Sequence, residues 1–373
     1  MQLKRMTKLG LAAGMAAGLV AAAGLTPALA KEFTYSTFIS PKSTNNTEGV
    51  EPMFERVKAA TNGEMDWKLY PAGQILAARS TLPGVRDGVA DAGFVVAAYH
   101  PSELKHTLVL ANMINSGSNA IAVAGAVNEA IMLGCKECQD DFRAQNSLYL
   151  GGHVTTSYYP MCAKKFDGLE GFKGLKIKAT GAFSGILQEL GAVPVNIPTD
   201  EMAEAMERGQ IDCVLGSLAW MENYSLKDVT NYVLEAPFGS TRGLGLMTVN
   251  KDVWEGLPAD QRKALLDNMG GMISGAVHGY LEQDEEAKKN AMAKGVVFEQ
   301  PSAAFSAALE PSPKFKQENL DKAASLGVKD PQKIADSFNA VLPKWQKIAE
   351  EVGMDKDAYA KALQREIYDK VDY

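Results

Sequence analysis

The chain has 373 residues and a formal net charge of −7, from 38 Lys and Arg against 45 Asp and Glu. Its 46% hydrophobic and 22% charged residues are ordinary globular values, which exclude a disordered, collagen-like or coiled-coil chain. The length suits two domains or one large one. The acidic balance argues against a protein that binds nucleic acid or docks on an anionic membrane, so we expect small molecules or proteins as partners.

The first thirty residues have the pattern of an export signal. Three basic residues between positions 4 and 8 precede an uncharged apolar run over 9–25, and Ala28-Leu29-Ala30 follows as a small-residue cleavage site. An uncleaved membrane anchor is the alternative, because the run approaches the length that spans a bilayer. Its Ala and Gly content favours a signal peptide over residues 1–30 that is cleaved after Ala30, which leaves a mature chain outside the cytoplasm.

Two stretches of the chain repeat one order of strands and helices. Alternating or short apolar runs predict strands near 33–37, 65–69 and 92–96, with helical spacing between them. The order recurs with strands near 175–179, 193–197 and 211–215. We therefore predict an α/β fold of two lobes, with a ligand crevice at the carboxyl ends of the strands.

The sequence becomes helical after Leu257. An apolar stripe from Leu265 to Leu281 predicts a helix of roughly 30 residues that lies along both lobes. Two shorter helices broken at Gly270-Gly271 are the alternative. Further amphipathic stretches near 332–351 and 356–370 complete the chain. We expect the chain to divide between the lobes so that the first holds residues 31–153 and 243–280 and the second holds residues 154–242 and 281–373.

Four cysteines, at positions 135, 138, 162 and 213, bear on the redox state of an exported chain. In an oxidising compartment they allow three full disulfide connectivities. Cys135 and Cys138 have the spacing of a redox or zinc motif, but no second Cys-x-x-Cys pair accompanies them. We expect a structural disulfide between Cys162 and either Cys135 or Cys138.

No enzyme motif that we sought is present in the sequence. Gly-x-Ser-x-Gly, His-Glu-x-x-His, the Walker lysine loop and the EF-hand loop are absent, and the four histidines never stand three or four residues apart. We therefore expect a binding protein with no enzymatic activity, no cofactor and no metal.

Five short segments lie in order along the mature chain: Tyr70-Pro-Ala-Gly-Gln74, Gly88-Val-Ala-Asp91, Gly174-Leu-Lys-Ile-Lys178, Gly191-Ala-Val-Pro194 and Arg208-Gly-Gln-Ile-Asp212. Together they resemble the periplasmic solute-binding subunits of TRAP (tripartite ATP-independent periplasmic) transporters. The resemblance implies a two-lobed periplasmic binding protein type II-like fold with a long helix spanning both lobes. It also implies a periplasmic monomer that closes on a small organic anion, a carboxylate or sulfonate, and delivers it to the membrane permease subunits of the transporter.

The resemblance singles out Lys178 as a ligand-binding residue. In the family this strand normally ends in an arginine that pairs with the substrate carboxylate. Arginine offers a planar fork for two parallel hydrogen bonds, whereas lysine offers a point charge with three donors. We expect an anion at Lys178 without that bidentate clamp.

Further ligand-binding candidates follow the predicted strands or open the helices after them, where free amides can accept an anion. They are Phe38, Ser40, Arg79, Val96, Tyr99, Tyr158, Gly181, Phe183, Thr199, Gly216, Ser217 and Trp220. Tyr158 stands where some members of the family carry a second arginine. Core packing is the alternative for the aromatic residues, and a solvated surface position is the favoured interpretation for Arg79.

A hinge is expected where the chain crosses between lobes, near residues 150–156 and 238–245. Gly151-Gly152 and the glycines at 239, 243 and 245 offer backbone freedom there. Two other functions are compatible with these features: the ligand-binding partner of a membrane sensor, and, less favoured, an exported enzyme.

Overall fold

A computed structural model describes residues 31–310 and 312–371 of the chain. The predicted signal peptide and its cleavage site at Ala30 lie outside these described residues.

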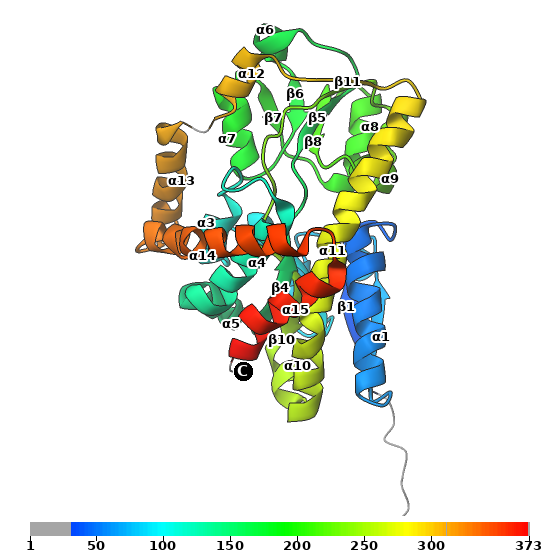
Figure 1. Ribbon diagram of the computed structural model, residues 1–373, viewed down its shortest axis with the longest axis vertical. Coiled ribbons are helices and arrows are strands. Elements are labelled where there is room, and N and C mark those ends of the chain that lie inside the picture. Colours follow the sequence, from blue (N-terminus) through cyan, green and yellow to red (C-terminus); the bar gives the residue numbers. More distant parts are fainter. Residues whose placement is uncertain (1–30, 311, 372–373) are drawn as a thin grey trace, which may run out of the picture.

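The first lobe is built on a five-stranded sheet (Figure 1). Its strands, in spatial order, are β2 (Met65–Tyr70), β1 (Lys31–Ser36), β3 (Ala92–Val96), β10 (Leu244–Asn250) and β4 (Ser147–His153). β1 runs parallel to β2 and β3, and β10 runs antiparallel to β3 and β4. The helices of this lobe are α1 (Glu51–Ala60), α2 (Thr81–Arg86), α3 (Lys105–Ala111), α4 (Ala120–Glu129), α5 (Lys136–Ala144) and α10 (Lys251–Gly256).

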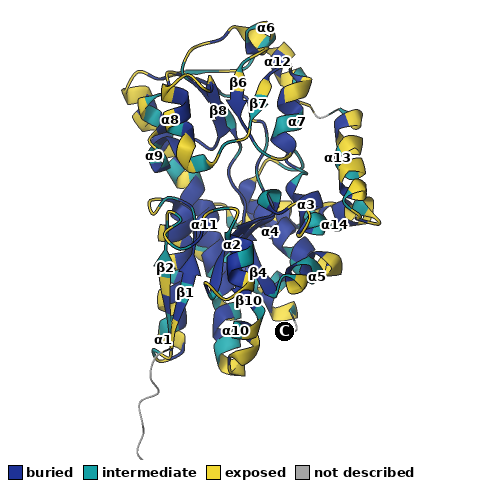
Figure 2. Cartoon of the chain, turned by 180° about the vertical axis from the view of Figure 1, so that it is seen from behind, coloured by how far each residue is buried: buried dark blue, intermediate teal, exposed yellow. Residues whose placement is uncertain are grey.

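The second lobe is built on a six-stranded sheet with its own core. In spatial order its strands are β11 (Val297–Glu299), β9 (Tyr232–Leu234), β5 (Tyr159–Cys162), β8 (Cys213–Gly216), β6 (Lys176–Lys178) and β7 (Val193–Val195). Its helices are α6 (Gly168–Phe172), α7 (Ala182–Glu189), α8 (Met202–Glu207), α9 (Trp220–Asn223) and α12 (Ala303–Ala308). The next helix, α13 (Pro313–Ser325), contacts both lobes, because it packs against α3 of the first and α7 of the second. Figure 2 shows the central strands of both sheets buried, while α13 is exposed along much of its length. The two predicted lobes are therefore confirmed.

A single helix, α11 (Ala259–Ala293), runs along both lobes for 35 residues (Figure 1). Its apolar residues from Leu265 to Val277 belong to the core of the first lobe, and Tyr280, Ala287 and Ala291 belong to that of the second. The predicted long helix is confirmed, and the alternative break at Gly270-Gly271 is wrong.

Glycines on α11 allow other backbone segments to approach it closely. A Cβ atom on Gly275 would lie 1.9 Å from the carbonyl oxygen of Glu48, which belongs to the short π-helix η1 (Asn45–Val50). One on Gly270 would lie 2.5 Å from the carbonyl oxygen of Ala360. These glycines are therefore required by packing and do not break the helix.

The last two helices, α14 (Pro331–Val352) and α15 (Lys356–Glu366), pack on the first lobe. α14 lies against α4, α15 lies against α11, and Trp345 and Tyr359 are fully buried in the first core. This packing differs from our division of the chain, which placed residues 281–373 in the second lobe. An amphipathic stripe shows that a helix has a buried face, but it does not show which surface covers that face.

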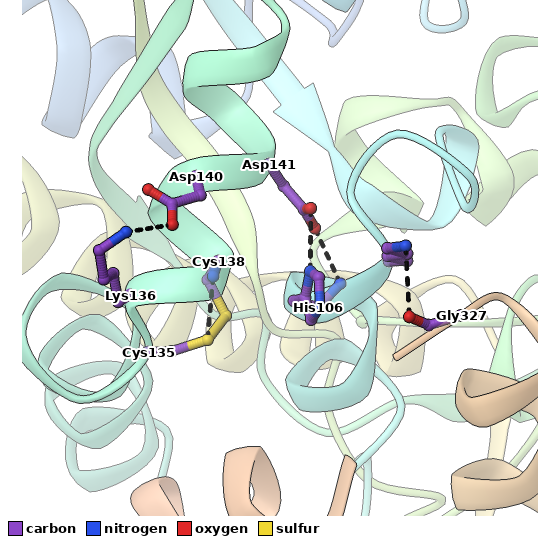
Figure 3. A network of polar contacts seen from close by, with 8 residues as sticks. His106, Cys135, Lys136, Cys138, Asp140, Asp141 and Gly327 are labelled. Atoms are coloured by element: carbon purple, nitrogen blue, oxygen red, sulfur yellow. Dashed lines mark hydrogen bonds and ion pairs between the residues drawn. A yellow bond between two sulfur atoms is a disulfide. The ribbon is translucent and has the colours of Figure 1, made fainter. Parts of the chain in front are cut away.

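The structure contains two disulfides, Cys135–Cys138 and Cys162–Cys213. The predicted bridge between Cys162 and Cys135 or Cys138 is wrong, because those residues lie in the cores of different lobes. Cys162 is paired with Cys213 across the antiparallel strands β5 and β8. Figure 3 shows the Cys135–Cys138 bridge at the start of α5, near the contact between His106 and Asp141 that ties α3 to α5.

Two crossover segments, in the regions where a hinge was predicted, join the lobes and are hydrogen-bonded to each other. The backbone amide of Thr155 donates to the carbonyl of Thr241, and that of Tyr158 donates to the carbonyl of Gly239. Gly239 has a φ of 101°, which favours glycine. Gly152 is needed for close packing of two strands, because a Cβ atom there would lie 2.0 Å from the carbonyl oxygen of Leu244 on the neighbouring strand.

Candidate functional site

A cavity of about 70 Å³ lies between the lobes, at the carboxyl ends of β1 and β3 on one side and of β6 and β8 on the other. Parallel strands end at the same edge of each sheet, so the loops that follow them converge on this space. The predicted residues that line it are Phe38, Val96, Tyr99, Tyr158, Lys178, Phe183, Thr199 and Trp220. The structure thus brings most of the predicted ligand-binding residues to one place.

The other predicted residues lie around this cavity without lining it. Arg79 lies with its guanidinium 5.5 Å from the centre of the Tyr99 ring, at the mouth of the cleft. Gly181 precedes α7 with a φ of 60°. The backbone carbonyl of Ser40 accepts a hydrogen bond from Asn46.

Gly216 and Ser217 do not line the cavity, but they contact residues that form or hold its wall. A Cβ atom on Gly216 would lie 2.3 Å from the Trp220 ring, so a side chain at position 216 would clash with the ring in its present position. The Ser217 hydroxyl donates to Asp284 Oδ1 at 2.6 Å and contacts the Thr156 hydroxyl at 2.8 Å. Burial raises the pKa of Asp284 to about 6, although the hydrogen bonds from Ser217 and from the backbone of Ala219 act in the opposite direction.

Lys178 is the cation of the cavity. Its position at the end of β6 is set by pairing with Val214 of β8 and Val195 of β7. The residue is only 3% exposed, and its ammonium lies 4.9 Å from the centre of the Trp220 ring. Within residues 31–310 and 312–371 no carboxylate forms an ion pair with it, and the lining of the cavity includes no Asp or Glu. Burial lowers the pKa of Lys178 to about 8.

Aromatic rings make up much of the remaining wall. The Tyr158 ring stacks on Phe183 at 4.8 Å and lies 5.0 Å from Trp220 in the second lobe. In the first lobe, Phe38 stacks on Phe94 at 5.3 Å. Such rings offer flat apolar faces on both sides of a bound molecule.

Several polar lining residues were not predicted from the sequence: Asn45, His153, Thr155, Tyr224, Thr241 and Tyr280. His153 ends β4, and Asn45 begins η1. Burial lowers the pKa of His153 to about 3, so its imidazole is neutral at physiological pH. No motif marks Asn45, His153 or Tyr280, because they reach the cavity through the packing of η1 and β4 against α11. Thr155 and Thr241 lie in the two segments that were predicted as a hinge, not as part of the site.

The cavity contains no catalytic arrangement. Its polar lining consists of one amine, one neutral imidazole, one carboxamide and several hydroxyls. No cluster of metal-ligating side chains occurs in the part of the chain that the structure describes. Among these same residues, no helix has the length and apolar character needed to cross a membrane.

Similar folds occur among solved structures of TRAP solute-binding proteins. One from Bordetella bronchiseptica, with bound mandelate, has a TM-score of 0.72 at 23% identity and covers 84% of this chain and 99% of that one. One from Rhodoferax ferrireducens, in complex with copurified benzoate, has a TM-score of 0.70 at 22% identity and covers 86% and 99%. At these identities the likeness shows the fold.

Two further relatives match the chain in sequence at similar identity. A monocarboxylate 2-oxoacid-binding periplasmic protein from a Nostoc species is 24% identical over 173 residues, which are 46% of this chain and 47% of that protein, so the match spans about half of its length. The outer membrane transporter protein TsaT of Comamonas testosteroni is 22% identical over 314 residues, which are 82% of this chain and 90% of that protein.

A family model adds direct evidence from the sequence. The model of the bacterial extracellular solute-binding proteins of family 7, named DctP, matches residues 35–319. This range contains both sheets, the cavity and α11. The chain therefore belongs to the DctP family of TRAP periplasmic solute-binding proteins, which bind their ligands and do not transform them.

Proposed function

We propose that the chain captures a small organic acid, a monocarboxylate or its sulfonate analogue, in the interlobe cavity and delivers it to the membrane permease subunits of a TRAP transporter. The observation that carries this proposal is the buried, unpaired ammonium of Lys178 inside an aromatic cavity.

A buried cation without a counter-ion is energetically unfavourable, because it has lost its water and gained little in return. The lowered pKa of Lys178 is the sign of that loss. A ligand anion would restore the missing partner through a charge-assisted hydrogen bond, worth about 1.5–3 kcal/mol net. The wall lacks any carboxylate that would repel such an anion.

The walls favour an acid with a flat, apolar body. Rings from both lobes face the cavity, which is enclosed between the lobes and lined mainly by apolar and aromatic side chains, as is typical of small-molecule sites. The solved structures of relatives with this fold include complexes with the small acids mandelate, benzoate, pyroglutamic acid and orotic acid.

We further propose that the protein acts as a monomer in the periplasm, after cleavage at Ala30. The family of extracellular solute-binding proteins and the pattern of residues 1–30 support this location. Closure of the lobes over the ligand would present one surface to the permease subunits, and the ligand favours that state by its greater affinity for it.

The test compares two lysines of one strand. A thermal-shift screen of the mature chain against aromatic and aliphatic monocarboxylates, sulfonates, dicarboxylates and amines identifies the tightest ligand, and calorimetry then measures its Kd. For Lys178→Met we expect the affinity to fall at least tenfold, the equivalent of about 1.4 kcal/mol. For the control Lys176→Met, whose side chain is exposed on the same strand, we expect no change. Unchanged affinity of Lys178→Met, or a screen in which only amines bind, would show that the proposal is wrong.

A further inference from the structure

Two polar side chains on the first-lobe wall of the cavity have hydrogen-bonding capacity that the protein does not use. Asn45 Nδ2 lies 3.0 Å from His153 Nε2, and both residues are only 1% exposed. Asn45 Oδ1 and His153 Nδ1 are also buried, and neither has a hydrogen-bond partner among the residues that the structure describes. Buried polar atoms without partners are uncommon and costly, which makes this pair a place where a ligand would gain affinity.

The unused atoms are one donor and one acceptor, whichever way the pair is oriented. If the Asn45 amide donates to His153 Nε2, the ring proton is on Nδ1, so Nδ1 is a free donor and Asn45 Oδ1 a free acceptor. If the amide is turned, its oxygen accepts from Nε2–H, and Nδ1 becomes the acceptor while the amide nitrogen keeps its hydrogens. A group that can both donate and accept therefore satisfies both atoms in either case.

The surroundings keep this pair uncharged. The His153 ring lies 5.1 Å from the Tyr280 ring and 6.3 Å from the Phe94 ring. Burial lowers the pKa of the imidazole to about 3, although the backbone of Val154 acts in the opposite direction. A second anionic group of a ligand would find no cation here, only an acceptor that repels it and a single neutral donor.

Lys178 lies in the other lobe from this pair. The Tyr280 ring stands beside His153, the Trp220 ring stands beside Lys178, and all four residues line the same cavity. The cavity therefore has a cation on its second-lobe wall and a neutral hydrogen-bonding pair on its first-lobe wall. A ligand that reaches both walls would hold the two lobes together.

We propose that the ligand is a monocarboxylic acid which carries, at the end opposite its carboxylate, a neutral group that both donates and accepts hydrogen bonds, and that Asn45 and His153 recognise this group. A hydroxyl and a cyclic amide have the required capacity, whereas a second carboxylate has only acceptors. The inference rests on the proposed function, because it assumes that the carboxylate binds Lys178.

Calorimetry with matched ligands tests this specificity. The probes are benzoate, 3-hydroxybenzoate, 4-hydroxybenzoate and isophthalate. For the native chain we expect at least one hydroxybenzoate to bind tenfold or more tightly than benzoate, and isophthalate to bind more weakly than benzoate. A missing hydroxyl is strongly discriminated against when a site is built to bond it, because the buried polar groups are then left without a partner.

Two variants assign the preference to the pair. In His153→Phe and in Asn45→Leu we expect the preference to disappear, so that the hydroxybenzoates bind no more tightly than benzoate does to the same variant. The control is His278→Phe, which removes another fully buried histidine with an unpartnered Nε2, on α11 outside the cavity lining. This control should keep the preference, and thermal unfolding of the unliganded variants shows whether each is folded.

The outcomes separate this inference from the proposed function. If benzoate binds and Lys178→Met abolishes its binding, but the native chain prefers isophthalate or shows no hydroxyl preference, the inference is wrong and the proposed function stands. A preference that survives both variants would also overturn it. If none of the four acids binds, the inference is wrong. If, in addition, no other acid in the thermal-shift screen binds, the proposed function is wrong as well.

Discussion

At the scale of single residues, Lys178 explains most of what the cavity can do. Its aliphatic stem and ammonium are enclosed by apolar and aromatic side chains, and burial alone accounts for its lowered pKa. A lysine in place of arginine binds a carboxylate as a point charge and without a fixed fork. It also titrates within a range that can be reached in a binding experiment, which arginine does not.

The titration of Lys178 predicts a pH-dependent affinity. With a pKa of about 8, the free protein holds a charged ammonium at pH 6.5 and mostly a neutral amine at pH 9.5. A bound anion favours the charged form, so the affinity should be constant well below pH 8 and fall towards tenfold per pH unit above it. Calorimetry across this range should show proton uptake on binding near pH 8. A flat profile, or an affinity that rises with pH, would contradict this role, and Lys178→Arg should give the flat profile.

The unliganded protein should respond to pH in the opposite direction. The pKa of Lys178 in the folded state is below the 10.5 of a solvated lysine, so between about pH 8 and 10.5 the unfolded chain binds more protons than the folded one. The free energy of unfolding therefore gains from this residue as the pH rises through that window. This opposite sign distinguishes a pH effect on binding from a general loss of stability.

The sequence predicted residues that line the cavity from both lobes, but it missed the polar pair of the first-lobe wall. Lys178, Trp220 and Phe183 could be predicted because each lies at a strand end or opens the following helix, where the fold class places ligands. Asn45 and His153 could not, because their meeting depends on how η1 and β4 pack on α11. The sequence around a histidine at the end of a strand does not indicate that an asparagine from another element will lie beside it.

At the scale of elements, α11 joins the two lobes through packing that only glycine permits. The Gly275 position faces the backbone of η1, the segment that also carries Asn45. The helix thus packs against the segment that carries Asn45 and in this way supports the first-lobe wall of the cavity. The apolar stripe predicted its length but left open a break at Gly270-Gly271, because the reason for its glycines became visible only in the packing of η1 and α15 against it.

Substitution of Gly275 by alanine should therefore destabilise the protein despite alanine's greater helix propensity. That propensity favours alanine by about 1 kcal/mol, whereas the new Cβ atom would lie 1.9 Å from the Glu48 carbonyl oxygen. We expect a net loss of about 1–3 kcal/mol in the free energy of unfolding. The control is Gly256→Ala at the end of α10, where a Cβ atom has no neighbour within 4 Å. Urea unfolding that ranks Gly275→Ala at or above the native chain would contradict this packing.

The two disulfides show where sequence patterns stop being informative. Cys-x-x-Cys spacing is compatible with a bridge, a metal site or a redox pair, and the structure shows a bridge at the start of α5. Cys162 and Cys213 are far apart in the sequence and meet because β5 and β8 are neighbours in the sheet. The repeated order of strands predicted both lobes, but it did not predict that β5 would be the antiparallel strand beside β8.

At the scale of the whole molecule, two cores are joined by a pair of crossover segments and one long helix. The crossover segments at Thr155 and Thr241 are hydrogen-bonded to each other, and both residues also line the cavity. The neighbouring Thr156 is tied through Ser217 to Asp284 on α11. We therefore expect that any movement of the lobes and occupation of the cavity are coupled through the same few residues.

The most direct test of this account is a crystal structure of the mature chain with the tightest-binding acid from the screen. The account predicts one carboxylate oxygen within about 2.7–3.2 Å of Lys178 Nζ, with the body of the acid between the aromatic walls of the two lobes. An acid bound with its carboxylate away from Lys178, or outside the interlobe cavity, would contradict the account.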